Sequence, residues 1–174
     1  MTKSNFTIAA VIFVALLTSV SASTQAQESS TSSSSQKEKV VSSHASGSFD
    51  VKVTPEPLAD KTADSTLGRM SIDKQYHGDL EGTGKGEMLT AGSSVKGSGA
   101  YVAIERVTGT LAGRTGSFVL QHRGIMTHGT PELSITVAPD SGTGQLEGIS
   151  GTMNIKIENG KHFYEFEYTL ASSK

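Results

Sequence analysis

The sequence predicts an all-β protein whose antiparallel strands close into a barrel. From residue 48 onward, apolar and polar residues alternate with a period of two in most segments, as in strands with one buried face. Short turn signals separate these segments, and glycines recur inside them, where they permit the coiling that closure requires. A sandwich of two sheets is the alternative, and the placement of the glycines favours the barrel.

Residues 1–26 have the pattern of a secretory signal peptide. Lys3 precedes an apolar run of about 15 residues, and Ala22 and Ala26 each offer a cleavage site after small residues. The run is shorter than the roughly 20 residues that a spanning helix needs, so we prefer a cleaved signal to a permanent anchor. We therefore expect a periplasmic or secreted protein with no stable membrane span after cleavage.

A Ser-rich segment follows at residues 27–47, and we expect a flexible linker because it can bury almost no apolar surface. The barrel domain is then expected over residues 48–174. The whole chain of 174 residues contains no Cys, which excludes a disulfide framework and a thiolate metal site. Its formal net charge of −2 argues against nucleic acid as a partner.

Two kinds of segment make up the expected barrel. Strict alternation predicts half-buried strands at residues 49–53, 70–77, 133–137, 153–157 and 162–170. Residues 101–107 and 118–120 carry apolar groups on both faces, which predicts central strands covered on both sides. Turn signals lie at residues 111–114, 139–142 and 158–161, and the Asn-Gly pair in the last is a strong hairpin signal. Strands joined by short turns predict an antiparallel meander.

Four motifs carry a resemblance to a known family. They are YHGDLEG at 76–82, ERVTGTL at 105–111, GSFVLQH at 116–122 and SGTGQLEG at 141–148. In this order they are similar to a bacterial family of unknown function that adopts the allene-oxide-cyclase-like barrel, a meander comparable to that of lipocalins. The resemblance implies about eight strands around an interior that is filled or holds one small ligand. No segment matches the active-site pattern of the plant cyclases, so the resemblance implies no catalytic residue.

Glu105 and His122 are the candidate acid–base residues, and their relation depends on the strand register. Glu105 interrupts an apolar strand, and His122 ends the next one. If residues 112–113 form a two-residue turn, both side chains can enter the lumen as a carboxylate–imidazole pair. If the loop is 111–113, Glu105 shares a face with Arg123 instead. A structural ion pair is the alternative to an acid–base role in either register.

The function that these features favour is the binding of a small apolar or amphiphilic molecule inside the barrel. The expected ligand-binding residues are Tyr101, Glu105, Phe118, Leu120, His122 and Tyr164. One alternative is a cofactor-independent isomerase or cyclase that resembles allene oxide cyclase, with Glu105 or His122 as the catalytic group. Another is a solid barrel that self-associates as a homo-oligomer. We expect no cofactor, and no metal site because the carboxylates near His77 do not complete a ligand set.

Overall fold

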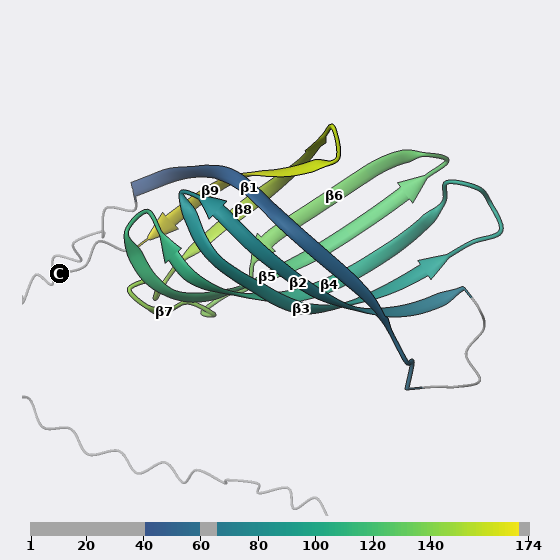
Figure 1. The fold of residues 1–174 in the computed structure, drawn as a ribbon, viewed down its shortest axis with the longest axis horizontal. Helices are drawn as coiled ribbons and strands as arrows, with labels where there is room; N and C mark the ends of the chain where they lie inside the picture. Colours follow the sequence, from purple (N-terminus) through teal and green to yellow (C-terminus); the bar gives the residue numbers. More distant parts are fainter. Residues whose placement is uncertain (1–40, 60–65, 171–174) are drawn as a thin grey trace, which may run out of the picture. The chain divides into compact units, whose positions relative to one another are not determined.

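The computed structural model describes residues 41–59 and 66–170, which form a closed antiparallel barrel of eight long strands without a helix (Figure 1). The strands are β1 (Val41–Glu56), β2 (Leu67–Gly78), β3 (Leu80–Gly92), β4 (Gly99–Leu111), β5 (Arg114–Thr127), β6 (Thr130–Val137), β8 (Ser150–Glu158) and β9 (Lys161–Leu170). The short β7 (Thr143–Gly144) pairs with β5 beside the ring. The predicted fold class is therefore confirmed.

The strands follow one another around the barrel in chain order. Each strand from β1 to β6 pairs antiparallel with the next, and β8 and β9 form the last hairpin. The ring closes where β9 returns to β1, from the pair Val41↔Leu170 to the pair Phe49↔His162. Each of the eight long strands therefore has a paired neighbour on both sides, although β6 and β8 share only one residue pair.

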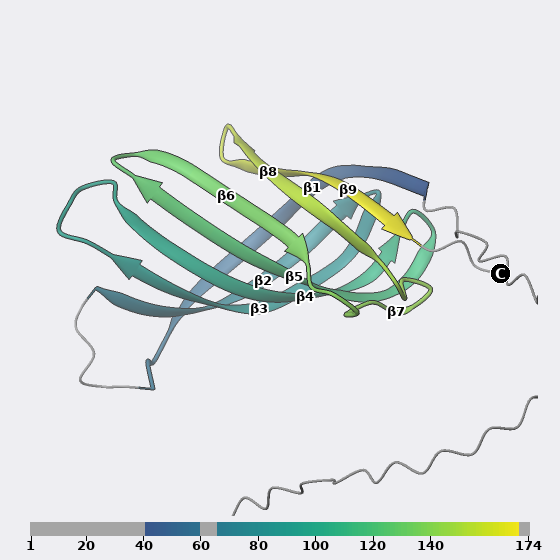
Figure 2. The same cartoon turned by 180° about the vertical axis from the view of Figure 1, so that it is seen from behind.

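One side of the barrel wall is lower than the rest. β6 and β8 share a single residue pair, Thr136↔Thr152, and the β8–β9 hairpin already turns at Glu158↔Lys161. Figure 1 and Figure 2 show this hairpin bending away from β6, while the hairpins β3–β4 and β5–β6 extend well beyond it. The end that carries these extended hairpins is called the open end below.

The first strand begins earlier than the sequence indicates. β1 starts at Val41, so residues 41–47, which we expected in the linker, pair with β9. Ala45 is fully buried on the inner face of β1, between outward-facing polar neighbours. Backbone pairing with β9 holds this Ser-rich stretch, although its side chains bury little apolar area. The expected signal peptide and the rest of the linker lie outside the described residues.

The other end of the barrel, called the closed end below, is filled by large side chains. Aromatic rings form its centre: Phe118 and Phe166 stack with ring centroids 5.6 Å apart, and Tyr76 and Tyr164 meet edge to face with centroids 5.7 Å apart. The residues that pack around these rings are at most 2% exposed: Leu80, Val107, Leu111, Leu120, Leu146, Ile149 and Met153. This half of the lumen has the dense packing of a protein core.

The outer face of β4 is exposed, which corrects the prediction that residues 101–107 are covered on both sides. Val102 and Ile104 point outward and are each 55% exposed. A closed barrel has only one covered face, the lumen, so apolar residues on both faces of a strand leave one set in solvent.

Candidate functional site

The register of the β4–β5 hairpin brings two predicted site residues into the lumen. Ala112 and Gly113 form its two-residue turn, with φ angles of 47° and 82° that are typical of a type I′ turn. This turn pairs Ala103 with His122 and Glu105 with Leu120. The first of the two registers left open by the sequence is therefore the one observed.

Glu105 is the centre of a buried polar cluster in the middle of the barrel. Its side chain is fully buried, and both of its carboxylate oxygens accept hydrogen bonds. Tyr76 Oη donates to Oε1 over 2.8 Å, and Lys74 Nζ donates to Oε2 over 2.7 Å. Lys74 Nζ also donates to Tyr76 Oη over 3.2 Å. We call Lys74, Tyr76, Glu105 and His122 the polar cluster.

Our sequence reasoning did not select Lys74 or Tyr76, although a signal for both was present. On β2 every second residue from Met70 points inward, and this places Lys74 between Ile72 and Tyr76 on the apolar face. A lysine on the buried face of a strand requires a compensating anion, because an unpaired ammonium is costly to bury. Only the folded barrel wall reveals that this anion is Glu105, from a strand that is not adjacent to β2.

The missing side chain of Gly84 makes room for the carboxylate. Gly84 lies on β3, the strand between Lys74 and Glu105 in the barrel wall. A Cβ atom at this position would overlap Glu105 Oε1 and approach Tyr76 Cε2 to 3.0 Å. The glycine therefore lets groups from β2 and β4 meet across β3.

The environment of Glu105 favours its charged form. Burial by itself raises the pKa of this carboxyl, but the neighbouring His122 imidazole and Lys74 ammonium outweigh burial and hold the pKa below its ordinary value. Burial and the adjacent Glu105 carboxylate raise the pKa of Tyr76 well above its ordinary value. The cluster thus contains an anionic Glu105 that accepts a hydrogen bond from a neutral phenol.

His122 contacts the same carboxylate from β5. Its Nε2 atom lies 3.0 Å from Glu105 Oε2, and the side chain is 4% exposed. The contact does not have the alignment of a hydrogen bond, so Nε2 is a buried polar atom without a hydrogen-bond partner in the described part of the chain. His122 therefore has hydrogen-bonding capacity that the protein itself does not use.

A cavity of about 210 Å³ reaches the polar cluster from the open end. We call it the luminal cavity; its wall contains Lys74 and His122 among apolar side chains. The full set is Phe49, Val51, Val53, Ile72, Lys74, Met88, Tyr101, His122, Leu133, Ile155, Ile157 and His162. Ile157 is 63% exposed at the low wall, so the cavity opens to solvent on that side.

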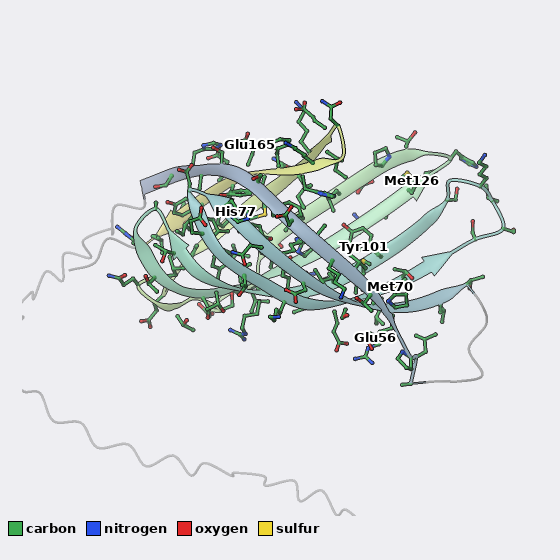
Figure 3. The ribbon with its side chains drawn as sticks, viewed as in Figure 1. Glu56, Met70, His77, Tyr101, Met126 and Glu165 are labelled. Carbon is green, nitrogen blue, oxygen red and sulfur yellow. The ribbon has the colours of Figure 1, made fainter. Side chains whose placement is uncertain are left out.

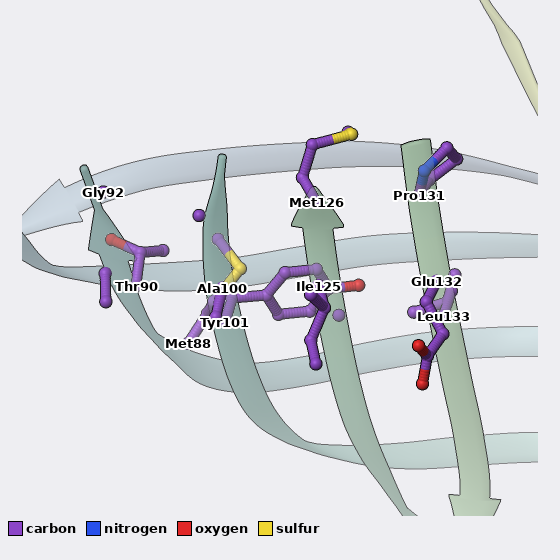
Figure 4. Close-up of a pocket in the computed structure, with 13 residues that line it drawn as sticks. Met88, Thr90, Gly92, Ala100, Tyr101, Ile125, Met126, Pro131, Glu132 and Leu133 are labelled. Atoms are coloured by element: carbon purple, nitrogen blue, oxygen red, sulfur yellow. The ribbon is translucent and has the colours of Figure 1, made fainter. Parts of the chain in front are cut away.

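A second, apolar hollow of about 550 Å³, called the trough below, continues toward the open end. It is formed by β3, β4, β5 and β6, and it shares Met88, Tyr101 and Leu133 with the luminal cavity. Figure 3 shows Tyr101 and Met126 at this end of the barrel, away from His77 and Glu165. Figure 4 shows the Tyr101 ring reaching from β4 toward β5, where Gly124 leaves room for it.

The six predicted ligand-binding residues fall into three groups. Tyr101 and His122 line the luminal cavity, and Glu105 lies behind His122 in the polar cluster. The other three, Phe118, Leu120 and Tyr164, are buried in the aromatic core of the closed end. The Tyr164 hydroxyl has a structural role there, since it accepts a hydrogen bond from the Leu80 amide over 2.8 Å.

The remaining charged groups lie mostly in surface pairs. His44 Nε2 lies 2.6 Å from Glu165 Oε2, and His77 lies near Asp50 and Glu81, all on the outer face. Within residues 41–59 and 66–170, no three His, Asp or Glu side chains converge as a metal ion would need. The same residues contain no helix long and apolar enough to cross a membrane.

Comparisons with known proteins place the chain beside proteins that share this barrel. A family model described as a protein of unknown function (DUF3224) matches residues 45–168. A crystal structure of a protein of unknown function from the same family, from Shewanella oneidensis MR-1, is 51% identical in sequence. The alignment covers 77% of this chain and 100% of that one, with a TM-score of 0.71. The search of curated proteins gave no match.

Proposed function

We propose a function for this chain, which belongs to the DUF3224 family of proteins of unknown function, from the geometry of its lumen. The barrel binds a small apolar or amphiphilic molecule in the luminal cavity. The observation that carries this proposal is a lumen filled at the closed end and hollow at the other, with the buried polar cluster at the bottom of a mostly apolar hollow. Small-molecule sites combine a mostly apolar wall with a few placed polar groups in this way.

The chemistry of Glu105 supports binding more than turnover. An isomerase that used Glu105 as a base would need a carboxylate free to take a proton from a substrate. Here both oxygens accept hydrogen bonds from Tyr76 and Lys74, and the lowered pKa makes the group a weak base. The carboxylate is therefore suited to holding Lys74 and His122 in place at the bottom of the cavity.

A pair of isoleucine substitutions tests the binding proposal. Ile155 lines the luminal cavity, whereas Ile104 is exposed on the outer face, so Ile155→Trp and Ile104→Trp add the same bulk inside and outside. We expect octan-1-ol to bind the natural protein and Ile104→Trp at one site in isothermal titration calorimetry. Ile155→Trp should bind at least about tenfold more weakly, because its indole occupies the cavity. No saturable binding to the natural protein, or equal binding to both variants, would exclude the proposed site.

We also propose that the protein works outside the cytoplasm. The support is the n-region, apolar run and small-residue pattern of residues 1–26. N-terminal sequencing of the protein recovered from the periplasm or medium of an expressing bacterium should show a start at Ser23 or Gln27. Recovery of the uncleaved chain from the cytoplasm would contradict export.

A further inference from the structure

We infer that the luminal cavity selects amphiphilic anions, whose charged head lies against Lys74 and His122 while the apolar chain extends into the trough. The inference rests on the ligand binding proposed above and names the chemical class of the ligand. Three features of the cavity carry it: the sign of the charges in its wall, the unused hydrogen-bonding capacity of two of its residues, and its shape.

Apart from the phenol of Tyr101, the ionisable groups in the cavity wall are all basic. Lys74, His122 and His162 contribute to the wall, and the lining contains no Asp or Glu. Glu105 lies behind this wall, fully buried, with both oxygens already accepting hydrogen bonds. A ligand in the cavity therefore meets an ammonium and imidazole rings, and the nearest carboxylate is already covered by Lys74, Tyr76 and His122.

Lys74 has one more donor than the protein uses. An ammonium carries three N–H groups, and two of them are used on Tyr76 Oη and Glu105 Oε2. No described residue accepts the third, and the Phe49 ring lies 4.7 Å from Nζ on the cavity side. An oxygen of a ligand head group can accept this N–H and form a charge-assisted hydrogen bond, one of the stronger kinds in proteins.

His122 adds a second group with unused capacity at the same point. Its side chain is 4% exposed and its Nε2 atom has no hydrogen-bond partner, although it lies 3.0 Å from Glu105 Oε2. Lys74 Nζ approaches that same oxygen, so the ammonium and the imidazole converge and one head group can reach both.

The shape of the hollow requires a chain as well as a head. The luminal cavity of about 210 Å³ corresponds to roughly seven water volumes at about 30 Å³ each, enough for a head group and a few carbons. The trough of about 550 Å³ continues it and is lined mostly by apolar groups such as Met126 and Ile125. An unbranched chain that leaves the cavity past Met88 and Leu133 would bury its methylenes there.

Two ligands of equal chain length test this inference. Octane-1-sulfonate carries a permanent negative charge, whereas octan-1-ol is neutral, and both can be titrated into the natural protein by calorimetry. We expect the sulfonate to bind at least about tenfold more tightly than the alcohol, because only the anion gains the contact with Lys74 and His122. If the alcohol binds and the sulfonate binds no more tightly, anion selection is refuted and the binding function stands. If neither binds, the binding function itself fails.

Variants then assign the selectivity to its residues. In Lys74→Met/Glu105→Gln, both buried charges are removed together, so folding is preserved better than in the single Lys74 variant. The ratio of sulfonate to alcohol affinity should fall to near one in this variant and to an intermediate value in His122→Gln. Lys85→Met is the matched control, since Lys85 pairs with Asp73 on the outer face, and it should retain the full ratio. An unchanged ratio in folded Lys74→Met/Glu105→Gln or in His122→Gln would overturn the assignment.

Discussion

Lys74→Met should lower the free energy of unfolding by about 3–5 kcal/mol, the usual cost of leaving one partner of a buried ion pair alone. Lys74 is 6% exposed and Glu105 is fully buried, so little water can replace the lost ammonium around the carboxylate. Glu105 would keep only the Tyr76 hydroxyl and the His122 imidazole as polar neighbours. For a domain of this size, the loss corresponds to a fall in melting temperature of roughly 10–15 °C.

Urea unfolding monitored by circular dichroism provides the assay, with the far-ultraviolet signal for strands and the near-ultraviolet signal for the buried tyrosines. The chain has no Trp, so the tyrosine signal is free of indole absorption. Lys85→Met is again the control, because its ion pair with Asp73 is exposed and should be worth less than about 1 kcal/mol. The double variant Lys74→Met/Glu105→Gln should lose less stability than Lys74→Met, because it leaves no buried charge unpaired.

The result that would refute this reasoning is a cost for Lys74→Met that equals the cost for Lys85→Met. Glu105 would then not be a buried anion that depends on Lys74, and the polar cluster would lose its electrostatic basis. A double variant less stable than Lys74→Met would also contradict it, because the coupling between the two charges would then have the wrong sign.

Two further predictions concern the same cluster. Burial raises the pKa of Glu105, but His122 and Lys74 lower it by more, so the folded-state pKa lies below the ordinary carboxyl value of about 4.3. The contribution of the charged Glu105 to stability is therefore complete above that ordinary value. That contribution is lost as the pH falls through the lower folded pKa. Urea midpoints measured from about pH 6 to about pH 3 should therefore fall less steeply in Glu105→Gln than in the natural protein. Identical slopes for the two proteins would contradict this prediction. Gly84→Ala should cost at least about 2 kcal/mol in urea unfolding, because its Cβ would overlap Glu105 Oε1. Gly92→Ala is the control, since its Cβ would approach nothing closer than Thr66 O at 3.7 Å, and equal costs for the two alanines would show that the carboxylate does not need this space.

The sequence by itself determined the fold class and the order of the strands. Alternation with a period of two is a local property, so it identifies strands such as 153–157 and 162–170 without any knowledge of their tertiary contacts. The turn at Asn159-Gly160 joins two of these segments, and its φ angles of 51° and 77° are those that the Asn-Gly pair predicts. A run of such strands with short turns predicts a meander, and the glycines inside the strands favour its closure into a barrel over a sandwich.

Only the tertiary structure decided the site. Alternation assigns residues to two faces, but where both faces of a strand are apolar, as at residues 101–107, it does not say which face is inside. The choice between a two-residue turn at 112–113 and a three-residue loop at 111–113 then shifts the register that places Glu105 beside His122. The pairing of Lys74 with Glu105 joins positions 31 residues apart across an intervening strand, through space that Gly84 leaves free. The curvature of the barrel wall brings these side chains together, and no local pattern contains that information.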